Sequence, residues 1–252
     1  MKNDQLIRYS RNIILPEIGE EGQKKLLAAK VLVVGAGGLG SPVLLYLAAA
    51  GVGTIGIIDD DRVELGNLQR QILHETADIN QPKAESARDA IHDLNPDIKI
   101  EIFNKRLTAG NIKGIIRNYD IIADGSDNFE TRFLLNDECF TAKKTLVSAA
   151  IHRFEGQLSV FKAYLGEKHP CYRCIYPEMP PPGTMPKCSE AGILGSVAGI
   201  MGAWQATEIL KEITGAGESL SGWLIIFDAL KSVSRKVKVK KNRECPVCCT
   251  AN

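Results

Sequence analysis

The sequence has no excess of charge of either sign. Its 31 Lys and Arg residues stand against 30 Asp and Glu residues, which leaves a net charge of +1. This balance excludes a bulk electrostatic attraction to nucleic acid or to an anionic membrane, so any anion site must be local. The 252 residues are 44% hydrophobic and 24% charged. That composition is typical of a soluble globular chain and excludes a disordered one.

The N-terminal residues also lack the apolar core of a signal peptide, which predicts a cytoplasmic protein. A charge-free run from Val31 to Ile58 is long enough to cross a bilayer, yet seven glycines and Pro42 interrupt it. The run therefore predicts a strand, a glycine turn, a helix and a second strand inside a folded core, and no membrane span.

Histidine is scarce, and the sequence offers no obvious histidine-based catalytic pair. We interpret each of the four as an ordinary surface or core residue: His74, His92, His152 and His169.

What the sequence does contain is a regular alternation of apolar strands and amphipathic helices. Strands are predicted at 31–34, 54–58, 98–103, 120–123, 145–149, 157–163, 223–227 and 234–241, the last with one charged, solvated face. Helices are predicted at 4–11, 41–50, 82–94, 111–117, 128–142 and 191–213, with a polar linker at 17–23. The pattern predicts a Rossmann-like α/β fold with a doubly wound, mixed sheet, in one domain over residues 1–252.

A glycine motif follows the first strand and opens a helix. Gly35, Gly37 and Gly40 fit the GxGxxG spacing, with Gly38 between them, and Asp59 follows the next strand. Glycines allow a close backbone approach, the helix N-terminus favours phosphate, and the acid can accept hydrogen bonds from a ribose. The motif predicts nucleotide binding, although a tight strand–helix turn without a ligand has the same sequence.

Cations near this motif favour ATP over a nicotinamide dinucleotide. Arg70 and Lys83 follow the acidic turn, and a triphosphate needs such fixed cations because charge moves onto the leaving pyrophosphate. Taken singly, either could be a surface salt-bridge residue. Asp61 and Asn67 are further candidates for nucleotide contact.

An acidic residue is predicted at the carboxyl end of a later strand. Asp127 could hold magnesium there through one or two oxygens, or could cap the following helix, and the two roles are compatible. Its neighbour Asn128 is another candidate for nucleotide contact.

Two CxxC pairs predict a structural zinc site. Four thiolates, from Cys171, Cys174, Cys245 and Cys248, would complete a tetrahedral shell and fasten a C-terminal extension to the same domain. Independent buried thiols or a redox pair are the alternatives, and the adjacent Cys249 competes for assignment as a ligand. A seventh cysteine, Cys188, follows a proline-rich loop and precedes a predicted helix at 189–191, a setting that favours the thiolate.

Several segments, in one order along nearly the whole chain, resemble the MoeB/ThiF family, bacterial relatives of ubiquitin-activating enzymes. They are 8–11 (RYSR), the glycine loop, 67–71 (NLQRQ), 81–83 (QPK), 126–128 (SDN), 171–174 (CYRC), 188–192 (CSEAG) and 245–248 (CPVC). The resemblance implies adenylation of the C-terminal Gly-Gly carboxylate of a ubiquitin-fold sulfur-carrier protein, with ATP and magnesium. It further implies a nucleotide-binding half at about 25–150 and a carrier-binding and zinc half at about 151–252.

The resemblance also implies roles for single residues. Asp59 resembles the ribose partner, Arg70 and Lys83 resemble phosphate ligands, and Asp127 resembles the magnesium-linked acid. Arg11 resembles an arginine that reaches the nucleotide of a neighbouring subunit, which implies a homodimer. In some members a cysteine at the position of Cys188 forms a covalent link with the carrier, while in others it is dispensable.

The carrier would serve thiamine or molybdopterin biosynthesis, and the acidic run 59–61 with the 8–11 segment is slightly closer to ThiF. The sequence ends at the second CxxC pair, so we expect the sulfur donor to be a separate protein. Two other functions remain open. An NAD-dependent dehydrogenase would leave Arg70, Lys83 and the paired cysteines without a role. A non-catalytic zinc-containing binding module would not need Asp127.

Overall fold

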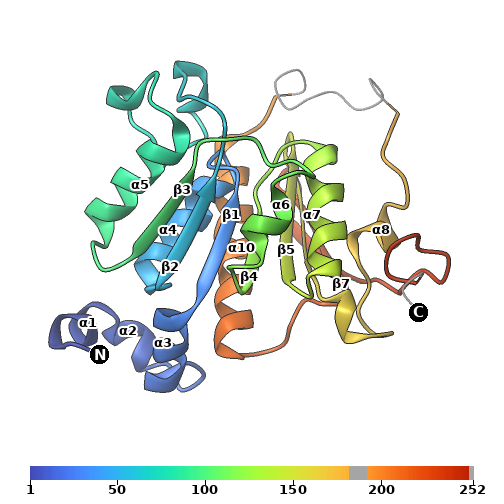
Figure 1. Ribbon diagram of the computed structural model, residues 1–252, viewed down its shortest axis with the longest axis horizontal. Helices are drawn as coiled ribbons and strands as arrows, with labels where there is room; N and C mark the ends of the chain where they lie inside the picture. The colour runs from blue at the N-terminus through green and yellow to red at the C-terminus, as the bar shows by residue number, and fades with distance from the viewer. Residues whose placement is uncertain (182–191, 250–252) are drawn as a thin grey trace.

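The computed structural model describes residues 1–181 and 192–249, and its centre is one eight-stranded sheet (Figure 1). The strand order is β3-β2-β1-β4-β5-β6-β7-β8. The strands are β1 (Lys30–Val34), β2 (Thr54–Ile58), β3 (Lys99–Phe103), β4 (Ile121–Asp124), β5 (Thr145–His152), β6 (Glu155–Phe161), β7 (Trp223–Asp228) and β8 (Val233–Lys238).

The sheet is parallel in its first part and antiparallel in its second. Strands β3, β2, β1, β4 and β5 run parallel, and β6, β7 and β8 each run antiparallel to the strand before them. The doubly wound, mixed sheet that the sequence predicts is therefore confirmed. The carboxyl ends of the parallel strands meet at one edge, where folds of this class bind their ligands.

Helices cover both faces of the sheet (Figure 1). The longer helices are α3 (Gly19–Ala28), α4 (Gly40–Ala50), α5 (Lys83–Leu94), α7 (Phe129–Thr141) and α10 (Gly195–Thr214). The shorter ones are α1 (Asn3–Arg8), α2 (Ser10–Ile13), α6 (Ile112–Ile116) and α8 (Tyr172–Ile175), with single 3₁₀ turns η1 (Leu65–Asn67), η2 (Thr76–Asp78) and η3 (Ala163–Leu165).

Strand alternation divides the core between the two faces. Val31 and Val33 face a cluster with α3, α4, α5 and α10, whereas Leu32 and Val34 face α6, α7 and α8. Because both faces of β1 are covered, its residues 31–34 are all buried, as a central parallel strand requires.

The charge-free run from Val31 to Ile58 forms β1, α4 and β2, as the sequence predicts. Gly51 ends α4 in the left-handed conformation, with φ of 86°, which glycine adopts without a steric cost. Among the described residues, no helix combines the length and the apolarity needed to cross a bilayer.

One predicted segment is wrong. The polar linker expected at 17–23 belongs mostly to α3, whose exposed face carries Glu20, Glu21 and Lys24. Its inner face buries Gln23, whose amide Nε2 donates to the carbonyl oxygen of Ala50 at 2.9 Å. Gln23 occupies a buried position where an amphipathic helix usually has an apolar residue. The sequence therefore shows no apolar face over 17–23, and this is why the helix was not predicted.

Candidate functional site

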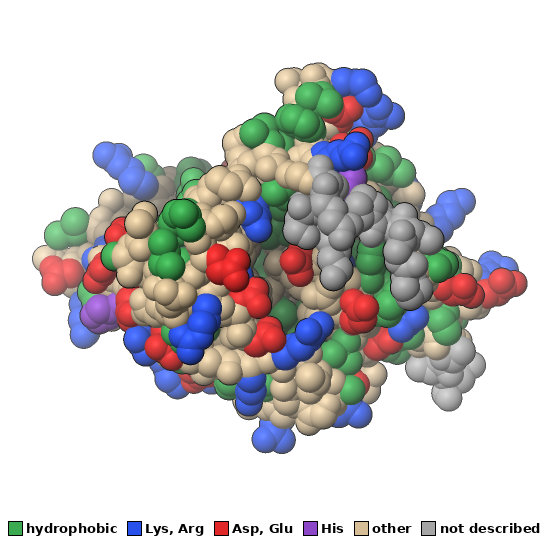
Figure 2. All heavy atoms as spheres, turned by 90° about the horizontal axis from the view of Figure 1, so that it is seen from above, with side chains coloured by type: hydrophobic (Ala, Val, Ile, Leu, Met, Phe, Trp, Pro, Cys, Tyr) green, Lys and Arg blue, Asp and Glu red, His purple; other side chains and the backbone are tan. Residues whose placement is uncertain are grey.

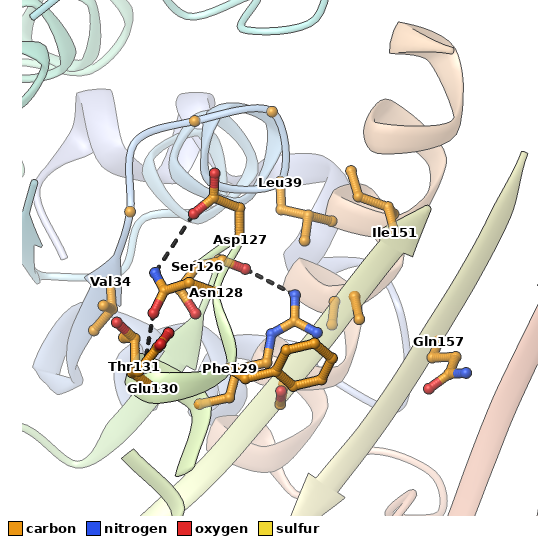
Figure 3. A pocket seen from close by; sticks show the side chains of 18 of the residues that line it. Val34, Leu39, Ser126, Asp127, Asn128, Phe129, Glu130, Thr131, Ile151 and Gln157 are labelled. Atoms are coloured by element: carbon orange, nitrogen blue, oxygen red, sulfur yellow. Dashed lines mark hydrogen bonds between the residues drawn. The ribbon is translucent and has the colours of Figure 1, made fainter. Parts of the chain in front are cut away.

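A pocket of about 1070 Å³ lies at the carboxyl ends of the parallel strands (Figures 2 and 3). Figure 2 shows its mouth as a hollow with acidic and basic side chains around it. Its walls come from the loops after β1, β2 and β4, and from β5 and β6. Nine of the site residues that the sequence predicts line it: Gly35, Gly37, Gly38, Asp59, Asp61, Arg70, Lys83, Asp127 and Asn128.

The glycines of the loop after β1 have two separate uses. Gly35 has φ of 92°, and a Cβ there would lie 2.9 Å from the carbonyl oxygen of Gly125. A Cβ on Gly40 would lie 1.9 Å from the carbonyl oxygen of Gly35, which no side chain allows. These two glycines shape the loop, whereas Gly37 and Gly38 line the pocket and leave room for a ligand.

Asp59, at the end of β2, supports this loop. Its Oδ2 accepts the backbone N–H of Ala36 at 2.7 Å, and its Oδ1 accepts that of Asp61 at 2.8 Å. Burial raises the pKa of the Asp59 carboxyl, while the nearby Lys83 ammonium opposes that rise. Each carboxylate oxygen can accept a second hydrogen bond, so Asp59 can hold the loop and still receive a ribose hydroxyl.

Lys83 brings a buried cation to the pocket. It is the first residue of α5, its side chain is 6% exposed, and its Nζ donates to Oδ2 of Asp61 at 2.8 Å. The Asp61 side chain is 67% exposed, so it offers only a weakly held counter-charge. Arg70 adds a second cation from the end of the segment after η1, with Nη1 donating to the carbonyl oxygen of Gly66 at 3.1 Å.

The turn after β4 presents Asp127 to the pocket. The buried carboxylate of Asp124 shapes this turn by accepting hydrogen bonds from the hydroxyls of Ser126 (2.6 Å) and Ser148 (2.7 Å). Asn128 caps α7, because its Oδ1 accepts the backbone N–H of Thr131 at 2.9 Å. Asp127 is therefore not the cap, and its exposed carboxylate points away from the helix (Figure 3).

Comparisons with known proteins identify the family. The model of the ThiF family matches residues 9–247. The chain belongs to the ThiF family.

Two curated relatives are each 48% identical to this ThiF-family chain. The first is a protein named sulfur carrier protein adenylyltransferase from Thermus thermophilus, and the match covers 97% of this chain and 91% of that protein. The second is the probable adenylyltransferase/sulfurtransferase MoeZ from Mycobacterium tuberculosis, where the match covers 98% of this chain but only 63% of MoeZ.

Among solved structures, MccB of E. coli with MccA-N7isoASN superimposes with a TM-score of 0.85. It covers 98% of this chain and 76% of MccB at 23% identity. At that identity the likeness concerns the fold, and it confirms the Rossmann-like architecture.

Three predicted residues are not among the described residues that line the pocket: Arg11, Gly40 and Asn67. Arg11 lies on α2 and is exposed, and Figure 1 shows α2 at the end of the molecule where β1 begins, away from the glycine loop. Asn67 is occupied locally, since its Oδ1 accepts the backbone N–H of Glu64 at 3.1 Å at the start of η1. Cys188 and the helix expected at 189–191 lie outside the described residues.

The two CxxC pairs meet at one point of the ThiF-family fold. Cys171, Cys174, Cys245 and Cys248 place their Sγ atoms within 4.8 Å of one another, and Cys171 lies 3.5 Å from Cys245. Four sulfurs at about 2.3 Å from one zinc ion would be about 3.8 Å apart in a tetrahedron, so this donor set fits zinc. Cys249 Sγ instead donates to the carbonyl oxygen of Asn242 at 2.9 Å, which leaves the four predicted cysteines as the cluster.

Sequence reasoning missed three polar residues of the pocket. Gln71 Oε1, Arg132 Nε and His152 Nε2 are buried and have no hydrogen-bond partner among the described residues, and all three residues line the pocket. Arg132 could have been found from its place near the start of the helix after Asp127. Gln71 ends the 67–71 segment that resembles the family, whereas His152 carries no such signal, because only the folded chain brings it to the pocket.

Proposed function

We propose that this chain uses ATP to adenylate the C-terminal Gly-Gly carboxylate of a ubiquitin-fold sulfur-carrier protein and releases pyrophosphate. The observation that carries the proposal is the meeting of four features in one pocket. These are the glycine loop, the ribose acid Asp59, the cations Arg70 and Lys83, and the exposed acid Asp127. Membership of the ThiF family and the names of its curated relatives support the same activity.

The charges of the pocket explain how the reaction proceeds. A carboxylate that attacks an α-phosphate brings two anions together, so cations must offset their repulsion before contact. Lys83 and Arg70 supply positive charge at the triphosphate end of the pocket. The carboxylate forms a bond to the α-phosphorus, and the bond to the pyrophosphate oxygen breaks. No general base is needed, since a C-terminal carboxylate is already ionised at neutral pH.

Asp127 is the residue that would hold magnesium. Its carboxylate is exposed to the pocket, is not used as a helix cap, and belongs to the oxygen donors that magnesium prefers. When bound, magnesium would neutralise phosphate charge and assist the departure of pyrophosphate. Asp127 would fix the position of that charge at the end of β4.

Zinc would have a structural role at the cysteine cluster. The four sulfurs close a tetrahedral shell and leave no open position for a reactant. Cys245 and Cys248 come from the C-terminal segment. Cys171 directly precedes α8, and Cys174 lies within it. The metal would fasten this segment beside α7 and η3, since Phe140 and Ala163 pack with the cysteines.

A homodimer would complete the nucleotide site. Arg11 is exposed and stands among exposed apolar side chains, of which Ile7 is 68%, Ile14 is 65% and Leu15 is 46% exposed. These side chains would be buried in a symmetric interface, from which Arg11 would reach the partner subunit's nucleotide. We further propose that the protein is cytoplasmic.

A dehydrogenase is the weaker alternative. A nicotinamide dinucleotide would use the glycine loop and Asp59, but it gives no use to a buried lysine and an arginine at the same pocket. A binding module without catalysis would likewise give no use to Asp127.

Pyrophosphate exchange tests the proposal. The chain is incubated with ATP, labelled pyrophosphate and one carrier protein at a time, drawn from thiamine and molybdopterin biosynthesis. We expect exchange with one carrier and none with the same carrier after its last glycine is removed. That result would also identify the pathway. Exchange that does not depend on the terminal carboxylate would contradict the proposed substrate.

A further inference from the structure

A buried histidine, His74, contacts the backbone of the glycine loop. His74 is 5% exposed, and its Nε2 lies 2.9 Å from the carbonyl oxygen of Ala36, inside the loop. A carbonyl oxygen can only accept, so Nε2 carries the proton and donates it. The N–H of the same residue, Ala36, donates to Asp59. The backbone of Ala36 is therefore held on both sides, by the buried His74 and the half-buried Asp59.

The ring of His74 is in turn fixed by α5. Its Nδ1 lies 2.7 Å from the hydroxyl oxygen of Ser86, and that hydroxyl also contacts Oδ2 of Asp78 at 2.8 Å. Ser86 is buried and follows Lys83 by one helical turn. The loop that would receive phosphate is thus tied to the helix turn that carries the pocket's buried cation.

These contacts close a ring. Asp59 accepts the backbone N–H groups of Ala36 and Asp61, and the Asp61 carboxylate accepts from Lys83. Lys83 and Ser86 both belong to α5, and Ser86 contacts His74, which donates to Ala36. Each link is 2.9 Å or shorter. A shift of the Lys83 turn would therefore move the glycine loop as well.

We propose that His74 is a positioning residue for the nucleotide: its Nε2–H holds the glycine loop in the shape that binds phosphate, and Ser86 orients its ring. This inference rests on the proposed use of ATP. His74 touches no reacting atom, so its effect falls on nucleotide affinity and not on carrier affinity.

The charged and titratable groups that face His74 are Lys83, Asp59 and Asp78. Burial lowers the pKa of His74, and the Lys83 ammonium acts in the same direction, whereas the two aspartates oppose them. The Ser86 hydroxyl has one proton and donates it to Oδ2 of Asp78, so it cannot also donate to Nδ1. The Nε2–H donates to the carbonyl oxygen of Ala36 whether the ring is neutral or charged.

The test compares substitutions that remove or keep the donor. His74→Leu removes it, and His74→Gln can restore it because the glutamine amide nitrogen reaches a similar position. We expect His74→Leu to raise the Kd for a non-hydrolysable ATP analogue and the KM for ATP about tenfold, as for a lost buried hydrogen bond. His74→Gln should stay within about threefold of the wild type, and the KM for the carrier should not change.

His169→Leu is the matched control. His169 is half-buried, and its Nδ1 contacts the hydroxyl of Ser221 at 2.8 Å, so it forms the same kind of pair away from the pocket. It should leave the Kd for the analogue unchanged. If His74→Leu does not fold, Ser86→Ala replaces it, with a smaller rise in the same Kd and no rise in the KM for the carrier.

Three results would overturn the inference: an unchanged Kd in a folded His74→Leu variant, failure of His74→Gln to restore binding, or equal rises in both KM values. Failure of the proposed function itself would look different. In that case neither the wild type nor the variants at position 74 would show carrier-dependent exchange.

Discussion

At the scale of single residues, contacts within the protein fix the charged side chains of the pocket. Asp59 already holds the glycine loop and Lys83 already lies against Asp61. A cation that is fixed in advance needs no rearrangement when the triphosphate arrives, which is the condition for effective electrostatic catalysis. The exposed Asp61 can give way to phosphate at little cost.

Lys83→Met should therefore separate activity from stability. We expect carrier-dependent exchange to fall about 100-fold, because the cation at the phosphates is lost. The free energy of unfolding should fall by less than about 1 kcal/mol, since the remaining Asp61 carboxylate is solvated. The control is Lys99→Met on β3, where an exposed lysine pairs with Glu101 at 2.6 Å. A large loss of stability in Lys83→Met would show that the lysine is chiefly structural.

The pH dependence of stability should report on His74. Its pKa lies below the ordinary value of 6.5, so the unfolded chain binds more protons at this residue than the folded chain. Stability therefore falls as the pH drops below about 6.5 and through the lowered pKa. His74→Gln removes this titration, so urea unfolding should show the variant losing less stability than the wild type between about pH 7 and 5. Parallel curves would contradict a lowered pKa of His74 in the folded chain.

At the scale of elements, the loop between β1 and α4 carries the tightest steric constraint of the site. Gly40 begins α4 so close to the backbone of Gly35 that an added Cβ would lie 1.9 Å from the Gly35 carbonyl oxygen. The loop must make this contact to turn the N-terminus of α4 toward the pocket, where it favours a phosphate.

Gly40→Ala should destabilise the protein by about 1 to 3 kcal/mol and abolish binding of the ATP analogue, because the added methyl group displaces the loop. Gly199→Ala on α10 is the control. A Cβ there meets nothing within 4 Å, so helix propensity should make that variant as stable as the wild type or more stable. Thermal unfolding and analogue binding measure both effects. Normal binding by Gly40→Ala would show that the loop tolerates displacement.

Most elements follow from local sequence, and the exceptions have physical causes. The strand at 54–58 begins and ends as predicted, because a buried parallel strand is a continuous apolar run between turns. The alternating charges also predict the exposed edge strand β8, although it ends at Lys238, three residues before the predicted end at 241. The helix α3 escaped prediction because its buried Gln23 finds its partner, Ala50, only in the folded chain.

The same distinction applies to the site. Motif residues such as Gly35 and Asp127 reach the predicted pocket, because spacing along a strand–turn–helix unit fixes their place. His74 was interpreted as an ordinary residue. Its partners, Ala36 and Ser86, come from two other segments, and no spacing rule connects the three.

At the scale of the whole molecule, one sheet crosses the boundary near residue 150. Strand β5 pairs with β4 on one side and with β6 on the other, so the nucleotide half and the C-terminal half share a continuous hydrogen-bonded layer. This continuity supports the proposal of a single domain. The cysteine cluster adds a second connection, between α8 and the C-terminal segment.

Cys245→Ser should lower the melting temperature and the zinc content together, because metal binding contributes directly to folding. Loss of one ligand should cost at least about 2 kcal/mol, or roughly 4 to 8 °C for a chain of this size. Cys249→Ser, at the last described residue, is the control and should keep both, because the Cys249 thiol pairs with the carbonyl oxygen of Asn242. Equal zinc content in the two variants would contradict the ligand assignment.

The dimer proposal predicts complementation between two inactive variants. Arg11→Ala removes the group that reaches the partner's site, and Asp127→Ala removes the acid within a subunit's own site. After the two are mixed, unfolded and refolded together, half of the dimers are mixed and hold one intact site of two, so about a quarter of wild-type exchange should return. No recovery from dimers shown to be mixed would place Arg11 and Asp127 in the same subunit's site.

The most direct test of the central claim is the intact mass of the carrier protein after incubation with this chain, ATP and magnesium. We predict that the carrier gains the mass of one AMP group, and that the gain disappears when its C-terminal carboxylate is amidated. A carrier whose mass is unchanged, from a reaction in which the chain is folded and binds ATP, would contradict adenylation of that carboxylate.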